Sequence, residues 1–421
     1  MSARRFLNIL VSDCQKFTYT LRRFDLSHNQ FFYPTPEEAA EHAKVLPPLT
    51  GMPDKSTLSA NSSAGAGHNK KKKPMYIRPP APMVNMKPSI CAKTRYDRWG
   101  EMDCFPLTET KLFFTDSSAR IFRFDADTHC IDTMPSLHTP KSDPLSFSIP
   151  PNPTTSKEGE GEGGGLYIMD RILRPNKEGQ VQFESISYRR RCNHSSKAWH
   201  CDALPPPPFV HDPAYKQASI CSYALVGGHT ICISIRGVGT YCFDTLACEW
   251  SKAGNWLMPF HGRAEYDPEL GLWLGVSERN IHLPCVADIS GVLRGEEPLP
   301  EHTRIWEDTD MPEGWYPHSQ CPTEVVSLGS GRFCVTNFVE TKEFDERCGH
   351  SLVDDIFAVF TGMELVLPGN DNDEGKANSN SKGDSKGNAN GNGNGIAGVR
   401  MIKHKSRSCR SRGTNLIKSV L

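Results

Sequence analysis

The alternation of apolar and polar residues is most regular between Tyr223 and Phe260, in the stretch YALVGGHTICISIRGVGTYCFDTLACEWSKAGNWLMPF. Gly227 and Gly228 follow the first apolar run, and Asp244 ends the third. Short runs rich in β-branched and aromatic residues, with glycines and acids between them, are typical of antiparallel strands rather than of a helix. The stretch therefore predicts one small sheet of consecutive strands. Its apolar runs are residues 224–226, 231–233 and 240–243.

Similar short strands separated by turns recur along the chain. One helix is expected at Pro36–Ala43, with Thr35 as its N-cap. All the other ordered segments have strand character, which predicts an all-β fold. The segments with this pattern are residues 6–34, 111–135, 166–205, 263–306 and 324–367.

An aromatic or small residue followed by an acidic residue recurs with these segments. The middle three pairs are about sixty residues apart, and the last follows at a shorter interval. A single four-stranded sheet cannot bury both of its faces, so stacked neighbours must cover them. The repeat predicts a β-propeller of about six blades, and seven blades stay open as an alternative. The pairs are Phe24-Asp25, Phe124-Asp125, Phe183-Glu184, Phe243-Asp244 and Ala287-Asp288.

Composition divides the chain further. Residues 1–46 are expected to supply N-terminal strands and residues 89–367 the blades. Residues 47–88, rich in Pro, Ser, Gly and Lys, and residues 368–395, rich in Asn and Gly, are predicted to be disordered inserts, because they lack the apolar residues needed to offset the entropy of ordering. Residues 396–421 are expected to form a closing strand and a basic tail.

The 48 Lys and Arg residues nearly balance the 49 Asp and Glu residues, so bulk attraction to nucleic acid or to a membrane is not indicated. The fifteen cysteines are scattered inside apolar runs, which is typical of small buried thiols in a reducing compartment. We expect a cytoplasmic or nuclear protein. The basic opening at Met1–Arg5 leaves an organelle transit peptide as an alternative.

Candidate chemistry is sparse. The segment RRRCNHSSKAWHC contains Cys192, His194, His200 and Cys201, but this spacing fits no zinc knuckle, and we predict no metal or other cofactor. No nucleophile elbow occurs, so no catalytic residue is predicted. The basic runs at Lys70–Lys73 and in KHKSRSCRSRG lack interleaved aromatic residues, and we therefore expect no specific nucleic-acid recognition.

Two sets of residues are singled out as structural or binding positions. The first set is predicted to hold the blades together, because its members are turn glycines, aromatic side chains and acids of the repeat: Gly227, Gly228, Tyr241, Phe243, Asp244, Trp250, Phe124 and Asp125. The second set lies beside predicted strand ends, where propeller loops form binding surfaces: Arg236, Arg263, Glu265 and Asp267. For Arg263 and Glu265 we favour pairing with each other between blades.

The glycine pair, the Tyr-x-Phe-Asp run and the Trp that follows resemble a kelch-type blade. More widely, the segments YTLRRFDLS, FFTDSSARIFRFDADT, YALVGGHTICISIRGVGTYCFDTLACEW and GRAEYDPELGLWLGVS resemble a plant family, expanded in grasses, that is defined as a domain of unknown function. The resemblance implies a kelch-like propeller and no catalytic residues.

These observations favour a monomeric, noncatalytic scaffold that binds a protein partner on its loop face. Two alternatives remain. One is a kelch-propeller enzyme of the oxidase or cyclase type, which requires metal ligands or paired acids at the channel mouth. The other is the substrate-binding subunit of a ubiquitin ligase, with the F-box supplied by another chain.

Overall fold

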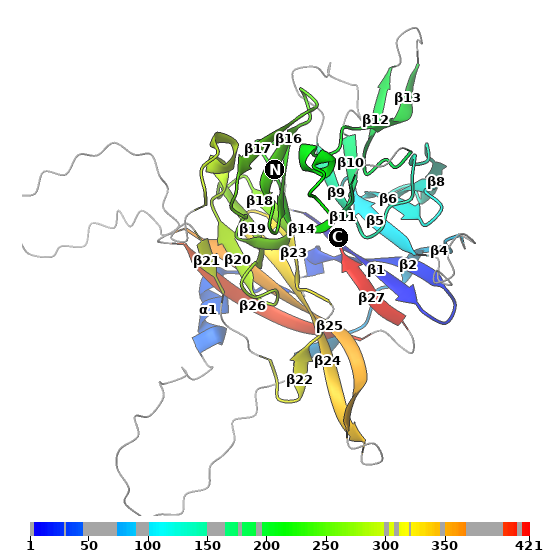
Figure 1. The fold of residues 1–421 in the computed structure, drawn as a ribbon. Helices are drawn as coiled ribbons and strands as arrows, with labels where there is room; N and C mark the ends of the chain where they lie inside the picture. Colours follow the sequence, from blue (N-terminus) through cyan, green and yellow to red (C-terminus); the bar gives the residue numbers. More distant parts are fainter. Residues whose placement is uncertain are drawn as a thin grey trace, which may run out of the picture.

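Almost all of the regular structure is β-strand (Figure 1). The computed structural model describes residues 4–28, 31–44, 74–89, 101–149, 165–175, 179–190, 196–298, 303–306, 311–319, 321–345, 350–367, 399–410 and 415–421. The described strands form six units of four strands each, called blades 1 to 6, with a few additional strands at their edges. The innermost strands of blades 4 and 5 also pair with each other in parallel, which joins these two blades into one nine-stranded sheet.

The strands of each blade follow one another from the innermost to the outermost in chain order, except that the innermost strand of blade 1 is the last strand of the chain. Blade 1 has β27 (Asn415–Val420), β1 (Phe6–Asp13), β2 (Thr18–Asp25) and β4 (Pro82–Met86); blade 2 has β5 (Met102–Pro106), β6 (Lys111–Asp116), β7 (Ile121–Asp125) and β8 (Cys130–Thr133). Blade 3 has β9 (Pro144–Ile149), β10 (Gly165–Asp170), β12 (Phe183–Arg190) and β13 (Lys197–Ala203); blade 4 has β14 (Ala218–Val226), β15 (Thr230–Ile235), β16 (Gly239–Asp244) and β17 (Glu249–Gly254). Blade 5 has β18 (Phe260–Asp267), β19 (Leu272–Ser277), β20 (Pro284–Ala287) and β21 (Thr303–Ile305); blade 6 has β23 (Glu324–Gly329), β24 (Arg332–Asp345), β25 (His350–Val366) and β26 (Arg400–Cys409). The remaining elements are β3 (Met75–Ile77), β11 (Ile172–Leu173), β22 (Trp315–Pro317), α1 (Pro36–Lys44), η1 (Leu26–His28), η2 (Pro208–His211) and η3 (Ser290–Arg294).

The blades follow one another around a ring, in chain order from blue to red in Figure 1. An apolar cluster lies at every junction between consecutive blades, including the junction of blade 6 with blade 1, where the Phe24 and Phe360 rings are 5.6 Å apart. Because both faces of each sheet are covered, β15 is buried along its whole length. Ile231 and Ile233 pack toward blade 3, and Cys232 packs toward blade 5. The chain is thus a six-bladed β-propeller.

The ring is closed by pairing the two ends of the described chain. Strand β27 is the inner strand of blade 1 and pairs antiparallel with β1, with Val11 opposite Ile417. Residues 396–421 supply two strands where one strand and a basic tail were expected. The basic segment 400–409 is β26, the outer strand of blade 6, and the strand that closes the ring is β27, which lies in the expected tail.

The predicted disordered insert 47–88 also needs correction. Residues 45–73 lie outside the described residues, but β3 and β4 fall within the insert. Strand β3 pairs parallel with β26 of blade 6, and β4 pairs antiparallel with β2 of blade 1. This segment therefore bridges the outer edges of the two blades that close the ring. The second predicted insert, 368–395, lies outside the described residues.

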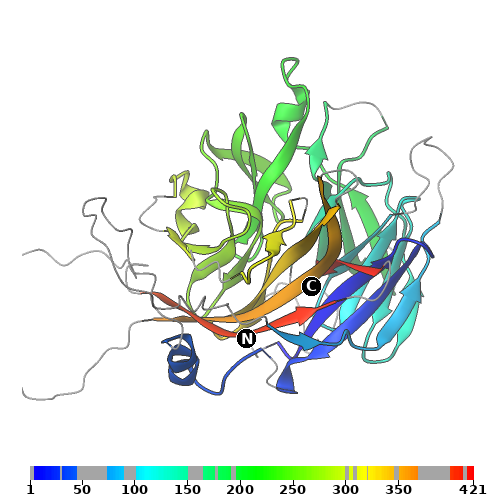
Figure 2. The same ribbon diagram turned by 90° about the horizontal axis from the view of Figure 1, so that it is seen from below.

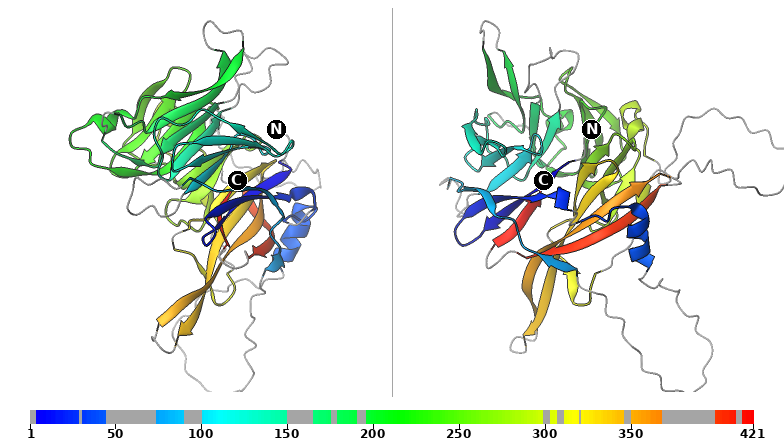
Figure 3. Two further views of the ribbon diagram at one scale, coloured as in Figure 1. Left: turned by 90° about the vertical axis from the view of Figure 1, so that its right-hand side faces the viewer. Right: turned by 180° about the vertical axis from the view of Figure 1, so that it is seen from behind.

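The predicted helix is confirmed as α1, and it lies beside β26 (Figures 2 and 3). The Thr35 hydroxyl accepts a hydrogen bond from the backbone N–H of Glu38 at 3.2 Å, the contact expected of an N-cap. The chain before the helix is held to β26 by His404, whose Nδ1 accepts the N–H of Tyr33 at 3.1 Å. The His404 Nε2 lies 2.9 Å from the Glu364 carboxylate.

The recurring acid has a common structural role. Asp125 Oδ1 accepts the backbone N–H groups of Asp127 and Thr128, and Asp244 Oδ1 accepts those of Leu246 and Ala247. In both cases the acid stabilises the turn after the third strand of its blade. The preceding residues Phe124 and Phe243, 1% and 0% exposed, pack between blades. Asp25 and Asp288 cap the equivalent turns of blades 1 and 5.

Phe183-Glu184 is not an equivalent pair, which corrects the counting of the repeat. It begins the third strand of blade 3 instead of ending it, so its acid does not cap the turn. The Phe183 ring lies 5.0 Å from that of Phe243 across the junction of blades 3 and 4. Glu184 is fully buried within blade 3.

Candidate functional site

The inner strands of the six blades surround a central channel with a volume of about 770 Å³. Side chains from every inner strand reach it, and many of them carry charge. The ionisable residues of the lining are Arg4, Asp103, Cys104, Asp143, Arg171, Cys221, Tyr223, Arg236, His261, Arg263, Glu265, Glu324 and Lys418.

Strand alternation explains how an apolar propeller acquires a polar channel. In β18, Phe260 and Ala264 point into the cluster between blades 4 and 5, whereas His261, Arg263 and Glu265 line the channel. Successive side chains of a strand point to opposite faces, so a polar residue at every second position forms a polar wall.

Three arginines approach one region of the lining, and each has an acidic neighbour. Arg171 lies 2.6 Å from Asp143, Arg236 lies 2.9 Å from Glu278, and Arg263 lies 3.3 Å from Glu265. The Arg236 side chain is 63% exposed and that of Arg263 is 37% exposed. Both guanidinium groups therefore keep donors that face water.

The charges of the neighbouring arginines affect the protonation of His261. Burial lowers the pKa of His261, and the positive charges of Arg171 and Arg236 lower it further, against a smaller opposing effect of Glu278. Its Nδ1 is buried and has no hydrogen-bond partner in the described part of the chain. The arginines thus favour a negatively charged group beside His261 and disfavour a second cation.

Glu324 contributes little negative charge to the channel. Burial raises the pKa of its carboxyl to about 8, and the N–H of Val420 donates to it at 2.6 Å. The lining contains five Arg and Lys residues and four Asp and Glu residues, of which Glu324 is mostly neutral at neutral pH. The channel therefore carries a surplus of positive charge in a chain whose net charge is −1.

The structure brings together three of the four residues proposed for loop-face binding. Arg236, Arg263 and Glu265 line the channel. Arg263 and Glu265 do pair, but they lie on the same strand, so the expectation of pairing between blades is wrong. Glu265 instead reaches blade 6, where its Oε2 accepts the N–H of Ser327 at 2.6 Å.

Asp267 does not belong to the binding surface. It is 1% exposed and its Oδ2 accepts the N–H of Gly331 at 3.0 Å, which fastens blade 5 to blade 6. Its Oδ1 accepts the N–H groups of Glu269 and Leu270 in the adjoining turn. Asp267 is therefore a structural residue of the turn and the blade junction.

The residues of the predicted repeat motif lie away from the channel wall, in turns and blade junctions. Gly227 and Gly228 have φ values of 63° and 76°, the left-handed conformation that glycine adopts readily, in the three-residue turn between β14 and β15. Tyr241 packs on Phe209 with ring centroids 5.0 Å apart. Trp250 packs on Phe243 at 5.0 Å.

Sequence reasoning missed several residues of the channel. Asp103, Arg171, His261, Glu324 and Lys418 come from five different blades, so their proximity depends on ring closure. The sequence does contain a signal for His261. Polar and apolar residues alternate in FHGRAEYD, which places His261 on the same side of the strand as Arg263 and Glu265.

The four Cys and His residues of the segment RRRCNHSSKAWHC do not form one cluster within the described residues. Cys192 and His194 lie outside the described residues, and the adjacent His200 and Cys201 of β13 point to opposite faces of their strand. Within the described ranges, the donor atoms close enough to share a metal ion belong to His138, Glu184 and Cys201, between blades 2 and 3. In these ranges no helix has both the length and the apolar character needed to cross a membrane.

Comparisons with known proteins identify a family. No curated protein matches the chain. The chain has 10% identity and a TM-score of 0.26 to the β-propeller domain of Cps50 (Swd1) from Myceliophteria thermophila, covering 47% of this chain and 58% of that one, which is less than two thirds. It has 11% identity and a TM-score of 0.34 to a chain in the complex of KlAtg21 with the coiled coil of AgAtg16, covering 84% of this chain and 99% of that one.

These TM-scores are too low for either similarity to support a conclusion about this chain. The propeller fold is established by the sheets and blade junctions described above. The family model described as "Protein of unknown function (DUF1668)" matches residues 4–410. The expectation of a family defined as a domain of unknown function is confirmed, whereas its plant origin stays a prediction. Since the match spans nearly the whole sequence, the chain belongs to the DUF1668 family.

Proposed function

We propose that this protein is a monomeric, noncatalytic interaction scaffold of kelch type, whose partner protein docks at the channel mouth and places an acidic side chain against Arg236 and Arg263. The observation that carries the proposal is the surplus of positive charge around a channel of about 770 Å³. A guanidinium presents a planar set of donors that matches a carboxylate, so an acidic group is the natural ligand of this surface.

Arg236 is well placed for first contact with a partner. It follows β15 in an exposed turn, and Glu278 engages one of its terminal nitrogens at 2.9 Å. The existing pair holds the guanidinium in place while the remaining donors face water. A carboxylate that enters beside it also approaches His261, whose buried Nδ1 has no protein partner within the described residues.

The kelch assignment is supported by blade 4. Its glycine pair forms the turn after the inner strand, and Tyr241, Phe243 and Trp250 pack at the junction with blade 3. A cytosolic or nuclear location is supported by cysteine usage, since residues such as Cys334, which is 0% exposed, serve as small apolar side chains within strands.

A noncatalytic role is supported by the state of Cys221, one of the two cysteines that line the channel. Cys221 donates a hydrogen bond to the Ser234 carbonyl at 3.2 Å. Burial raises the pKa of its thiol, and Arg236 offsets only part of this effect. The nucleophilic form of cysteine is the thiolate, so a thiol held protonated in this way is a weak nucleophile.

The test compares affinity-purified partners from native tissue by mass spectrometry. The bait proteins are the wild type, the double variant Arg236→Ala/Arg263→Ala, and Arg189→Ala as a matched control. Arg189 also pairs with a carboxylate, Asp202 at 2.7 Å, but lies on the outer strands of blade 3.

We expect partners that are retained by the wild type and by Arg189→Ala and lost from the double variant, together with weaker retention at high salt. Circular dichroism verifies that the double variant is folded. Identical partners for all three baits would contradict docking at the channel mouth. Turnover of a substrate panel by the purified protein would contradict the noncatalytic role.

A further inference from the structure

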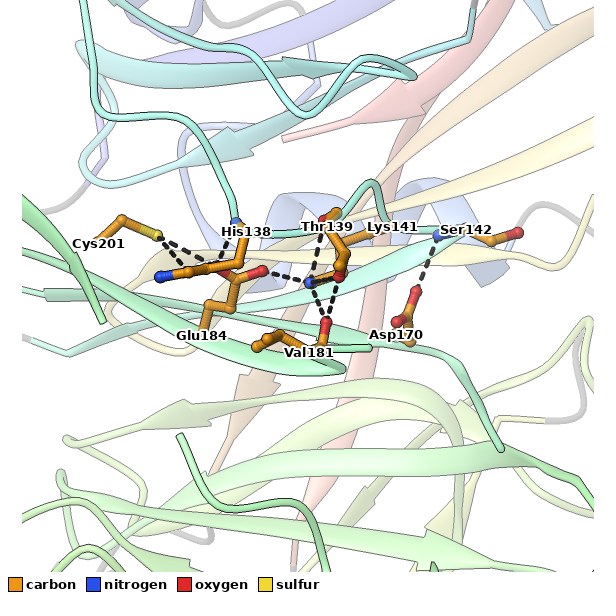
Figure 4. A network of polar contacts seen from close by, with 8 residues as sticks. All are labelled: His138, Thr139, Lys141, Ser142, Asp170, Val181, Glu184 and Cys201. Atoms are coloured by element: carbon orange, nitrogen blue, oxygen red, sulfur yellow. Dashed lines mark hydrogen bonds and ion pairs between the residues drawn. The ribbon is translucent and has the colours of Figure 1, made fainter. Parts of the chain in front are cut away.

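Three potential metal ligands converge at a place away from the channel lining (Figure 4). His138 lies on the segment that connects β8 of blade 2 to β9 of blade 3. Glu184 is on β12 and Cys201 is on β13, where Cys201 is opposite Ile186, so Glu184 and Cys201 are diagonal neighbours on one face of the sheet.

Their donor atoms surround a single carboxylate oxygen. Glu184 Oε2 lies 2.6 Å from His138 Nδ1 and 3.2 Å from Cys201 Sγ, and the sulfur lies 4.0 Å from the same nitrogen. The backbone N–H of His138 also donates to Oε2 at 2.8 Å. All three side-chain donors are therefore within reach of one small ion.

The carboxylate is fixed from its other side. Lys141 Nζ contacts Glu184 Oε1 and is itself fully buried, and it also donates to the Val181 carbonyl at 2.6 Å. Figure 4 shows Lys141 on one side of the Glu184 carboxyl group and His138 and Cys201 on the other. This contact leaves Oε2 as the oxygen that faces His138 and Cys201. Hydrogen bonds of this kind orient ligating carboxylates in metal sites.

We propose that His138, Glu184 and Cys201 form a binding site for one zinc-class divalent cation, ligated by Nδ1, Oε2 and Sγ. The mixed nitrogen, oxygen and sulfur set suits zinc, whereas magnesium and calcium select oxygen ligands alone. The His138 side chain is 47% exposed, so a fourth ligand such as water reaches the ion from this side.

The geometry needs only a small adjustment. Tetrahedral zinc with bonds of about 2.0 to 2.3 Å places its ligand atoms roughly 3.3 to 3.6 Å apart. The three separations in the structure are 2.6, 3.2 and 4.0 Å. Each therefore has to change by less than about 1 Å. The half-exposed His138 is free to make this movement, whereas Glu184 is held in place.

Binding also has a defined proton balance. Without a metal, the Cys201 thiol keeps its proton, which it donates in the hydrogen bond to Glu184 Oε2. On ligation the sulfur releases that proton to solvent as it binds the ion. His138 coordinates through Nδ1, which requires that its ring proton be on Nε2, and exchange with solvent at the exposed side of the ring allows this change of tautomer. The ion replaces the hydrogen bonds to Oε2 and fastens the linker after blade 2 onto blade 3.

The experiment titrates the purified, chelator-treated full chain with Zn²⁺ by calorimetry and with Co²⁺ by absorption spectroscopy. Cys201→Ser and His138→Gln remove one ligand each. Cys248→Ser and His229→Gln are matched controls, because both residues lie on turns of blade 4, where Cys248 is exposed and His229 is partly exposed. Thermal unfolding of each protein verifies the fold.

We expect one high-affinity equivalent of Zn²⁺, a Co²⁺ spectrum with a sulfur charge-transfer band, and a rise in the thermal midpoint on loading. Both ligand variants should lose affinity by at least about tenfold, and Cys201→Ser should also lose the charge-transfer band. The controls should behave as the wild type. Absence of a high-affinity equivalent, or binding and spectra that are unchanged in the two ligand variants, would overturn the proposal.

Discussion

Replacing Trp250 by Ala removes an aromatic side chain that joins two blades. The indole of blade 4 lies 5.0 Å from the ring of Phe243 in its own blade and 5.9 Å from the ring of Phe183 in blade 3. Its Nε1 donates a hydrogen bond to the Pro205 carbonyl at 2.8 Å, in the segment that follows blade 3. We expect this substitution to lower the free energy of unfolding without affecting the channel.

The magnitude follows from the contacts. Trp250 is only half-buried, so we expect a loss near the lower end of the roughly 3 to 5 kcal/mol typical of a fully buried aromatic. About 100 Å² of shielded ring area contributes ~2.5 kcal/mol. The hydrogen bond to Pro205 adds about 1 kcal/mol. The expected loss is therefore about 3.5 kcal/mol for Trp250→Ala. Trp250→Phe, which keeps a ring, should lose about 1 to 1.5 kcal/mol.

Urea denaturation followed by circular dichroism measures both variants against the wild type. Affinity purification of partners from folded Trp250→Ala, under native conditions, shows whether binding is affected separately. A loss below about 1 kcal/mol for the alanine variant would refute the reasoning, since it would mean that the blade junction does not depend on this ring. Equal losses for alanine and phenylalanine would assign the whole effect to the hydrogen bond.

Two further predictions concern the channel and the ring closure. Glu324 has a pKa of about 8 in the folded protein against an ordinary value of 4.5, so the folded state retains a proton that the unfolded chain releases. The free energy of unfolding should therefore fall as pH rises from about 4.5 to 8, by at most about 1.4 kcal/mol per pH unit. Glu324→Gln should flatten this slope in urea titrations at several pH values. A slope that persists in the variant would contradict this assignment. Gly362→Ala places a Cβ 2.3 Å from the backbone oxygen of Phe31, so the N-terminal segment must move, and the expected cost is about 1 to 3 kcal/mol in thermal or urea unfolding. A neutral effect would show that this contact yields easily.

The blades were predictable from the sequence because their determinants are local. The alternation in β14 to β17, the glycine pair at Gly227-Gly228 and the acid at Asp244 each act within a few residues. Asp125 and Asp244 recur because the turn after a third strand leaves backbone N–H groups that a short acid accepts. Phe183-Glu184 imitates this pattern in the sequence while it occupies a different place in its blade.

The channel was predictable only in part. Arg236, Arg263 and Glu265 were identified because they lie beside strand ends, but Asp267 follows the same rule and is buried at a blade junction. That a residue is near a strand end shows where it lies along its strand. It does not show which way the side chain points. That direction depends on which neighbouring blade covers which face.

The sequence by itself determined that this protein is a ring of small antiparallel sheets, since strand periodicity and turn chemistry are properties of short segments. Only the tertiary structure decided how the ring closes, with Ile417 opposite Val11, and which charged side chains meet in the channel. It also decided that His138, Glu184 and Cys201 share one place, although they come from a linker and two strands. Contacts between residues so far apart in the chain arise only when the strands and linkers that carry them are in position, and no local pattern encodes them.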